Sequence, residues 1–180
     1  MVPNARLSPT FEDLPGKDIG ARFAQQLASD PTIRMAYGRM DVALDRFFER
    51  ALLISYRPAR DQGELPAASG SGFVSRSARY VFRAQVESDR AKHLRWWTES
   101  QLGPWLAGDA TRNSLMNEPV ITLDDRDPFR TDILHEYFVP RDRFVQFVDG
   151  LREIVRTAPV PLLNASVRVV HREDNFLTYA

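Results

Sequence analysis

The alternation of hydrophobic and polar positions is clearest in the last third of the chain, where it predicts a strand, a helix and another strand. Residues 132–139 have the β-branched and aromatic composition of a strand. Residues 141–156 carry apolar side chains at helical spacing, from Phe144 to Val155. Residues 162–170 alternate strictly, so successive side chains point to opposite faces of a sheet.

Earlier in the chain, spacing and helix-breaking residues predict four further elements. Residues 18–27 are expected to form a short helix, with Asp18 as its N-cap and Ile19 and Phe23 one turn apart. Strands are expected at residues 32–42 and 49–57. Residues 77–102 lack glycine and proline and predict a long helix that ends at Gly103-Pro104.

This order of elements predicts an α+β fold, with a mostly antiparallel sheet and helices packed on one face. Residues 1–30 are expected to be a proline-rich, irregular N-terminal arm followed by the short helix. Residues 31–180 are expected to form one folded domain, because 180 residues fit a single domain. Residues 105–130 predict a long irregular stretch, which in a compact domain is usually functional.

The composition excludes several classes of function. The chain has 24 basic and 24 acidic residues, so it lacks the positive excess expected of a sequence-independent nucleic-acid binder. It has no cysteine, which excludes disulfides and thiolate metal sites. No apolar run reaches the roughly 18 residues that a membrane span needs, and residues 1–18 have no apolar core typical of a secretory signal. A cytoplasmic location without membrane contact is therefore expected.

Polar side chains are expected to gather on the sheet face that the helices leave uncovered. The final strand supplies an amide, a hydroxyl and a guanidinium, and the earlier strands add two arginines and one carboxylate. The residues of this face are Asn164, Ser166, Arg168, Arg39, Arg57 and Glu136. Two interpretations are open: a solvated face with weak ion pairs, or a floor that binds a small polar substrate.

Glu136 distinguishes these two interpretations. It stands between Leu134 and Phe138 on the same face of the expected strand, so its carboxylate needs a partner or water. Neighbouring strands lie about 4.8 Å apart, which lets a glutamate and an arginine on one face meet. We therefore expect Glu136 to pair with Arg168 or Arg39, which would hold the carboxylate ionised and oriented toward a ligand.

Other catalytic or metal-binding patterns are weak. His93 lies in a charged stretch and is expected at the surface, His135 is expected in packing, and His171 in a loop. No two histidines have the spacing of metal ligands, so no metal site is predicted. The chain has no G-x-S-x-G, no P-loop and no G-x-G-x-x-G, and no catalytic or cofactor-binding residue is assigned.

Five segments carry a family resemblance: Tyr37-Gly38-Arg39, Arg95-Trp96-Trp97, residues 111–119, residues 131–140 and residues 163–168. They resemble the substrate (cap) domain of FAD-linked oxidases of the vanillyl-alcohol oxidase type, which include sugar-lactone and alditol oxidases. The resemblance runs from about residue 30 to the end of the chain, and its most specific motifs are Asn117-Glu118-Pro119 and His135-Glu136-Tyr137-Phe138-Val139-Pro140.

The resemblance implies a ferredoxin-like cap whose antiparallel sheet covers a flavin ring and binds the substrate alcohol. It places substrate-binding roles on Glu136, Asn164, Ser166 and Arg168, and the polar face adds Arg39. In a complete enzyme the alcohol carbon would be oxidised by hydride transfer to FAD, with the protein supplying orientation and electrostatics.

The chain also departs from that family. No glycine- and serine-rich pyrophosphate loop precedes residue 30, and relatives continue with further cap strands beyond the position of Ala180. The resemblance therefore implies a C-terminally incomplete cap that binds no FAD alone and is inactive alone. Such a cap would work with a separate FAD-binding polypeptide, or be the remnant of a split or truncated gene. An uncovered sheet face and edge also predict a homo-oligomer. The alternative is a stand-alone α+β binding or oligomerisation domain that has lost the redox function.

Overall fold

A five-stranded antiparallel sheet forms the middle layer of the protein, in a computed structural model that describes residues 3–65, 80–86, 88–117, 128–129, 131–158 and 161–170. The strand order is β4-β1-β3-β2-β5. The strands are β1 (Arg6–Pro15), β2 (Met35–Met40), β3 (Arg50–Pro58), β4 (Ala110–Thr111) and β5 (Ser166–Val167). Every pairing between these neighbours is antiparallel.

β3 is the centre of the sheet. It pairs with β1 along its whole length, from Leu7 opposite Pro58 to Pro15 opposite Arg50. On its other side it pairs with β2. Residues 51–56 of β3 are all buried, which explains their nearly continuous hydrophobic run, since both faces of this strand are covered.

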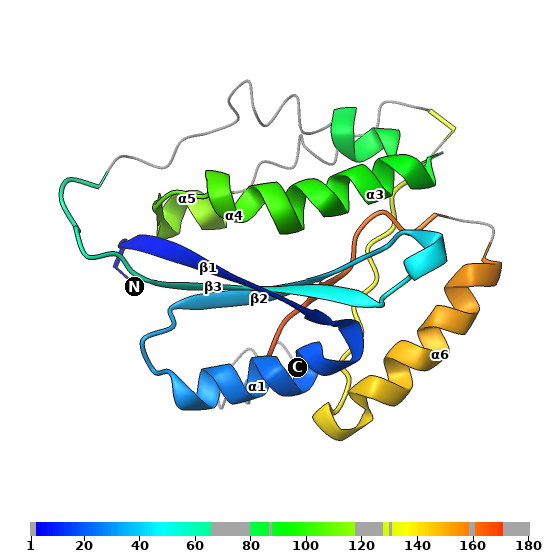
Figure 1. Ribbon diagram of the computed structural model, residues 1–180, viewed down its shortest axis with the longest axis horizontal. Helices are drawn as coiled ribbons and strands as arrows, with labels where there is room; N and C mark the ends of the chain where they lie inside the picture. The colour runs from blue at the N-terminus through cyan, green and yellow to red at the C-terminus, as the bar shows by residue number, and fades with distance from the viewer. Residues whose placement is uncertain are drawn as a thin grey trace.

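Helices cover both faces of the sheet. On one side lie α1 (Ile19–Ser29) and α6 (Phe144–Thr157), and on the other lie α3 (Asp89–Trp97), α4 (Gly103–Leu106) and α5 (Arg112–Met116) (Figure 1). Short helical turns join them: η1 (Gly16–Asp18), η2 (Leu44–Arg46), η5 (Arg141–Arg143) and a π-helical turn, η3 (Thr98–Leu102), that links α3 to α4.

Each face of the sheet has its own hydrophobic core. In the first core, Ala51 and Leu53 of β3 pack with Phe23 of α1 and Val148 of α6. Leu52, Ile54 and Tyr56 of the same strand pack on the opposite side with Trp96 of α3. The α+β class and the antiparallel sheet are thus confirmed, but the prediction that helices pack on one face only is wrong.

Several predicted elements are present. The expected helices at residues 18–27 and 141–156 correspond to α1 and α6, and the expected strands at 32–42 and 49–57 correspond to β2 and β3. In residues 162–170 the predicted alternation of buried and exposed side chains is largely present, with Ala165, Val167 and Val169 packed against the first core. Only Ser166–Val167 pairs as a strand there, opposite β2.

Three predictions need correction. Residues 6–15 of the expected irregular arm form β1, the longest strand described. The expected long helix is interrupted at residues 85, 86 and 88. Gly103 does not end it, because α4 begins at Gly103 and Pro104 lies in its first turn, where the missing N–H is tolerated. Residues 132–139 do not form a strand: this segment has no ladder partner and its side chains are mostly exposed.

The close packing of α1 on β2 depends on Gly38. A Cβ atom at this position would lie 2.3 Å from Cδ1 of the buried Ile19 and 3.2 Å from Cβ of Val167. A larger residue at this position would therefore force the buried side chain of Ile19 to move.

Among the described residues, no helix has the length and apolar character needed to cross a membrane.

Candidate functional site

Charged side chains are concentrated between α3 and the connection that joins β2 to β3. α3 begins at Asp89 because Ser88 is its N-cap, with the hydroxyl accepting a hydrogen bond from the N–H of Ala91. Asp89 and His93 are one turn apart, so they lie on the same face of the helix. We call this region the polar belt; it comprises Arg39, Asp41, Asp45, Arg46, Asp89, Lys92, His93, Arg95 and Glu99.

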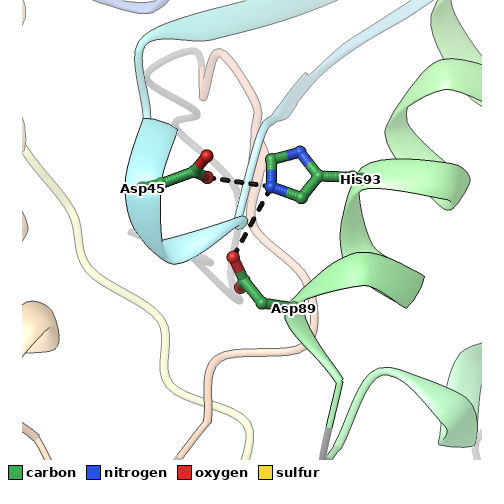
Figure 2. A group of neighbouring side chains, drawn as sticks. All are labelled: Asp45, Asp89 and His93. Carbon is green, nitrogen blue, oxygen red and sulfur yellow. Dashed lines mark ion pairs between the residues drawn. The ribbon is translucent and has the colours of Figure 1, made fainter.

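At one end of the polar belt, two carboxylates converge on an imidazole (Figure 2). Nε2 of His93 lies 2.9 Å from Oδ1 of Asp45, which is in η2, and 3.6 Å from Oδ2 of Asp89. The three possible ligand atoms lie within 4.8 Å of one another. Oδ1 of Asp89 accepts a hydrogen bond from the N–H of Leu44 at 2.9 Å, which fixes this carboxylate against η2.

Arg46 lies on the other side of the imidazole. Its Nη2 is 2.6 Å from Nδ1 of His93 and 3.3 Å from Oδ2 of Asp41. Since a guanidinium only donates hydrogen bonds, Nδ1 is the acceptor, and the ring proton is on Nε2, facing Asp45. The imidazole thus connects a cation on one side with carboxylates on the other.

Asp41 is the most deeply buried acid in the polar belt, with a side chain only 1% exposed. Burial raises the pKa of its carboxyl group, although a hydrogen bond from the N–H of Ala43 and the charge of Arg46 act in the opposite direction. Oδ2 of Asp41 and Nε of Arg46 are both buried without a hydrogen-bond partner. The ion pair therefore leaves hydrogen-bonding capacity unused on both sides.

At the other end of the polar belt, Glu99 joins two arginines. Its Oε1 accepts hydrogen bonds from Nη2 of Arg39 at 2.9 Å and from Nε of Arg95 at 2.7 Å. Burial alone would raise the pKa of Glu99, but the two guanidinium groups outweigh it and hold that pKa below its usual range. Arg95 also donates to the carbonyl oxygen of Leu163 at 3.0 Å, so this group ties α3 to β2 and to the segment before β5.

A small cavity lies within this ionic group. It is lined by residues that include Arg39, Arg95, Glu99 and Asn164, and its free volume is about 10 Å³. That volume is about what one water molecule needs. As it stands, the cavity is too small for a sugar or any other organic substrate.

The five predicted substrate-binding residues do not form one site. Arg39 and Asn164 line the same cavity, and Ser166 is directly opposite Arg39 in the sheet. Arg168 is exposed beyond β5. Glu136 lies in the exposed segment 131–140, in an open groove beside α6 that Arg143 and Phe147 also line.

The expected pairing of Glu136 with Arg39 is wrong, because Arg39 donates to Glu99 instead. The expected position of Arg57 on the same face as Arg39 is also wrong. Arg39 is opposite Leu52, whose side chain packs toward α3, whereas Arg57 donates to Asp30 at the end of α1, on the other face.

Sequence reasoning missed most of the polar belt. His93 was expected at the surface, yet its ring has partners on both sides. The spacing of Asp89 and His93 on one helix was a usable signal, because residues four apart share a helix face. No sequence signal places Asp45 beside them, since that contact depends on how η2 packs on α3.

Several large apolar side chains along the run from α3 to α4 are exposed. While Trp96 packs on the sheet, Trp97 is 54% exposed and Trp105 is 88% exposed. We call this group of side chains the outer ridge; its members are Leu94, Trp97, Leu102, Trp105 and Leu106. Tryptophan is rarely left this open to solvent in a protein that has no partner.

Comparison of the chain with protein-family models, curated proteins and solved structures found no match.

Proposed function

We propose that this chain is an α+β binding domain that functions as a homodimer, with two copies packed through the outer ridge. The observation that carries the proposal is the exposure of Trp105. Leu106 and Leu94 of the same ridge are exposed as well. Exposed aromatic side chains of this kind are the usual anchors of protein interfaces.

The size of the outer ridge supports an interface rather than scattered surface residues. Two tryptophans and three leucines on one helical run present several hundred square ångströms of apolar surface, on the order of the ~800 Å² that each partner contributes to a stable interface. Single exposed hydrophobic residues need no explanation, but five large ones between residues 94 and 106 do.

A second copy is the occupant that the charge of the chain favours. The 24 basic and 24 acidic residues give a formal net charge of zero, so two copies do not repel each other. A row along one helix is also self-complementary, because two such helices can pack about a twofold axis with the same residues on both sides.

The arrangement of layers favours this stand-alone domain over a flavoenzyme cap. A cap that covers a flavin ring needs an accessible sheet face, whereas in the described residues α1 and α6 cover one face and α3, α4 and α5 cover the other. The interface proposed here also differs from the sheet face or edge that the sequence suggested.

Sedimentation velocity of the parent and of Trp105→Glu tests the proposal. The parent should be a dimer at tens of micromolar. The variant should dissociate at least about 30-fold more readily, because a central tryptophan contributes about 2 kcal/mol or more to an interface. Ile154→Glu on α6 is the matched control, since Ile154 is 66% exposed and lies on the opposite layer. A monomeric parent, or equal dissociation of the two variants, would refute the proposed dimer.

The cap function is a second candidate, supported by one observation: Arg39 and Asn164, two residues of the family-like motifs, lie around the same small cavity. That cavity would have to widen before it could hold a substrate, because its present volume suits about one water molecule. In this proposal the chain is a ferredoxin-like cap that binds a small polar alcohol, and a separate polypeptide holds FAD. Material purified through this chain from its own host should then carry the visible flavin absorbance in near-stoichiometric yield with a second polypeptide. Colourless material would exclude this candidate.

A further inference from the structure

We propose that Asp45, Asp89 and His93 form a site for a divalent transition-metal ion, with zinc as the best-fitting ion. This inference is independent of the dimer and of the cap function. It starts from the spacing of the ligand atoms: zinc bonds to imidazole nitrogen and carboxylate oxygen are about 2.0–2.2 Å long and tetrahedral. Two ligand atoms on such an ion are therefore roughly 3.3–3.5 Å apart. The measured separations from Nε2 of His93, 2.9 and 3.6 Å, lie on either side of that value.

The backbone supports of the three ligands make the site well defined. Asp89 and His93 come from consecutive turns of α3, so their separation is fixed by the helix. Asp45 comes from η2, and the N–H of Leu44 in that turn binds Oδ1 of Asp89. Oδ2 of Asp89 is the oxygen that faces His93, as Figure 2 shows, and it is therefore the one available to an ion.

The chemistry of the ligands selects the class of ion. One imidazole with two carboxylates suits zinc and other first-row dications, whereas magnesium and calcium prefer oxygen ligands alone. Three protein ligands leave a fourth tetrahedral position for water or for a ligand from another molecule. Zinc is the reference ion for a test because it has no redox chemistry and is usually four-coordinate and tetrahedral when bound by protein side chains.

A second observation comes from Asp41 and Arg46. When an ion binds Nε2 of His93, the ring proton must move to Nδ1. Without the ion, Nδ1 is the atom that accepts a hydrogen bond from Nη2 of Arg46 at 2.6 Å. Arg46 must then leave the imidazole. Oδ2 of Asp41 and Nε of Arg46 are both buried without a hydrogen bond, and turning the guanidinium toward Asp41 would satisfy both. The unsatisfied pair thus provides the position that Arg46 would take when the ion binds.

Isothermal titration of zinc chloride into the full chain, prepared without a histidine tag, tests the site. The parent should bind one zinc ion per chain, while magnesium chloride should give no comparable binding. His93→Gln should weaken zinc binding by at least about tenfold, since even indirect partners of metal ligands contribute that much. His135→Gln is the matched control, because His135 is exposed in the segment 131–140.

Arg46→Gln separates this proposal from nonspecific zinc binding by a histidine. The amide oxygen of glutamine can accept a hydrogen bond from Nδ1–H. The cation that contacts the imidazole is removed, while Lys92 stays 3.7 Å from Oδ1 of Asp89 in both proteins, so zinc binding should tighten several-fold. Circular dichroism of each variant confirms that it is folded. Equal zinc binding by His93→Gln and His135→Gln, weaker binding by a folded Arg46→Gln, or no binding by the parent would overturn the proposal.

Discussion

Replacing Glu99 by alanine should destabilise the protein through the two arginines that the carboxylate joins. Glu99 is 30% exposed, and the side chains of Arg39 and Arg95 are more buried still. Breaking a fully buried ion pair costs about 3–5 kcal/mol, and an exposed pair is worth about 0.2–1 kcal/mol. For this half-buried group we expect a loss of about 2–3 kcal/mol, because Arg95 keeps its hydrogen bond to the carbonyl oxygen of Leu163.

Glu99→Gln should lower the free energy of unfolding by less, about 1 kcal/mol, because the amide keeps the shape of the side chain and one acceptor oxygen. The assay is urea unfolding at a single protein concentration, since the stability of a dimer depends on concentration. The midpoint should fall without a change in slope. Glu12→Ala is the matched control: Glu12 pairs with Arg22 at 2.7 Å, but both side chains are more exposed, so less than about 1 kcal/mol should be lost.

The dependence on pH gives the same reasoning a second test. The folded protein holds the pKa of Glu99 below its unfolded value. The stabilisation is therefore complete above the unfolded pKa of about 4.3 and is lost as the pH falls through the folded value. The stability difference between the parent and Glu99→Gln should shrink in that acidic range. If Glu99→Ala unfolds within 0.5 kcal/mol of the parent at neutral pH, or if the difference does not shrink in acid, the assigned role of Glu99 is wrong.

Three further changes test other parts of the structure. Gly38→Ala should lower the free energy of unfolding by about 1–3 kcal/mol, because its Cβ would lie 2.3 Å from Cδ1 of Ile19. A melting temperature equal to that of the parent would contradict this. Phe23→Ala should lose about 3–5 kcal/mol in urea unfolding, since the ring is fully buried in the first core, and a loss below 1 kcal/mol would contradict the packing. Asp30 should titrate by NMR with a pKa of about 2, owing first to the hydroxyl of Thr32 and then to a neighbouring arginine; Thr32→Val should raise that pKa, and an unchanged value would exclude the hydrogen bond as its cause.

Helices and strands with a strong periodicity of apolar residues could be predicted from the sequence, because that pattern indicates which face of the element is buried. The apolar stripe from Phe144 to Val155 predicts α6 and its packing on the first core. The alternation around Val167 likewise predicts which side chains of that segment face the core. Periodicity could not show how many helical layers there are, since β3 is apolar on both faces and is compatible with either arrangement.

β1 could not be recognised because its prolines argue against a strand. Pro9 and Pro15 lack the N–H that a ladder uses. The fold tolerates them because β4 pairs with Arg6 and Leu7, so that within the described part of the chain the rest of β1 has β3 as its single strand neighbour. A proline can occupy such an edge when its nitrogen faces away from the partner.

Residues 132–139 show the opposite error. Ile133, Leu134, Tyr137 and Phe138 have strand propensity, which describes suitability for a pleated, half-buried surface. It does not supply a partner strand, and the segment has no regular secondary structure and is mostly exposed. The predicted role of Glu136 depended on that strand. Asp45 reaches His93, and Arg39 reaches Glu99, only through tertiary packing.

The position of β3 has a consequence for the order in which the protein folds. β1, α1, β2 and β3 all lie between Arg6 and Pro58, so the central part of the sheet is complete in the first third of the chain. Residues 6–58, which leave the ribosome before the other described elements, thus bring the central strands together early in synthesis. The amides of β3, held between two strands and two helical layers, should be the last to exchange with deuterium, whereas α6 and β5 join this unit from far along the chain and should open first.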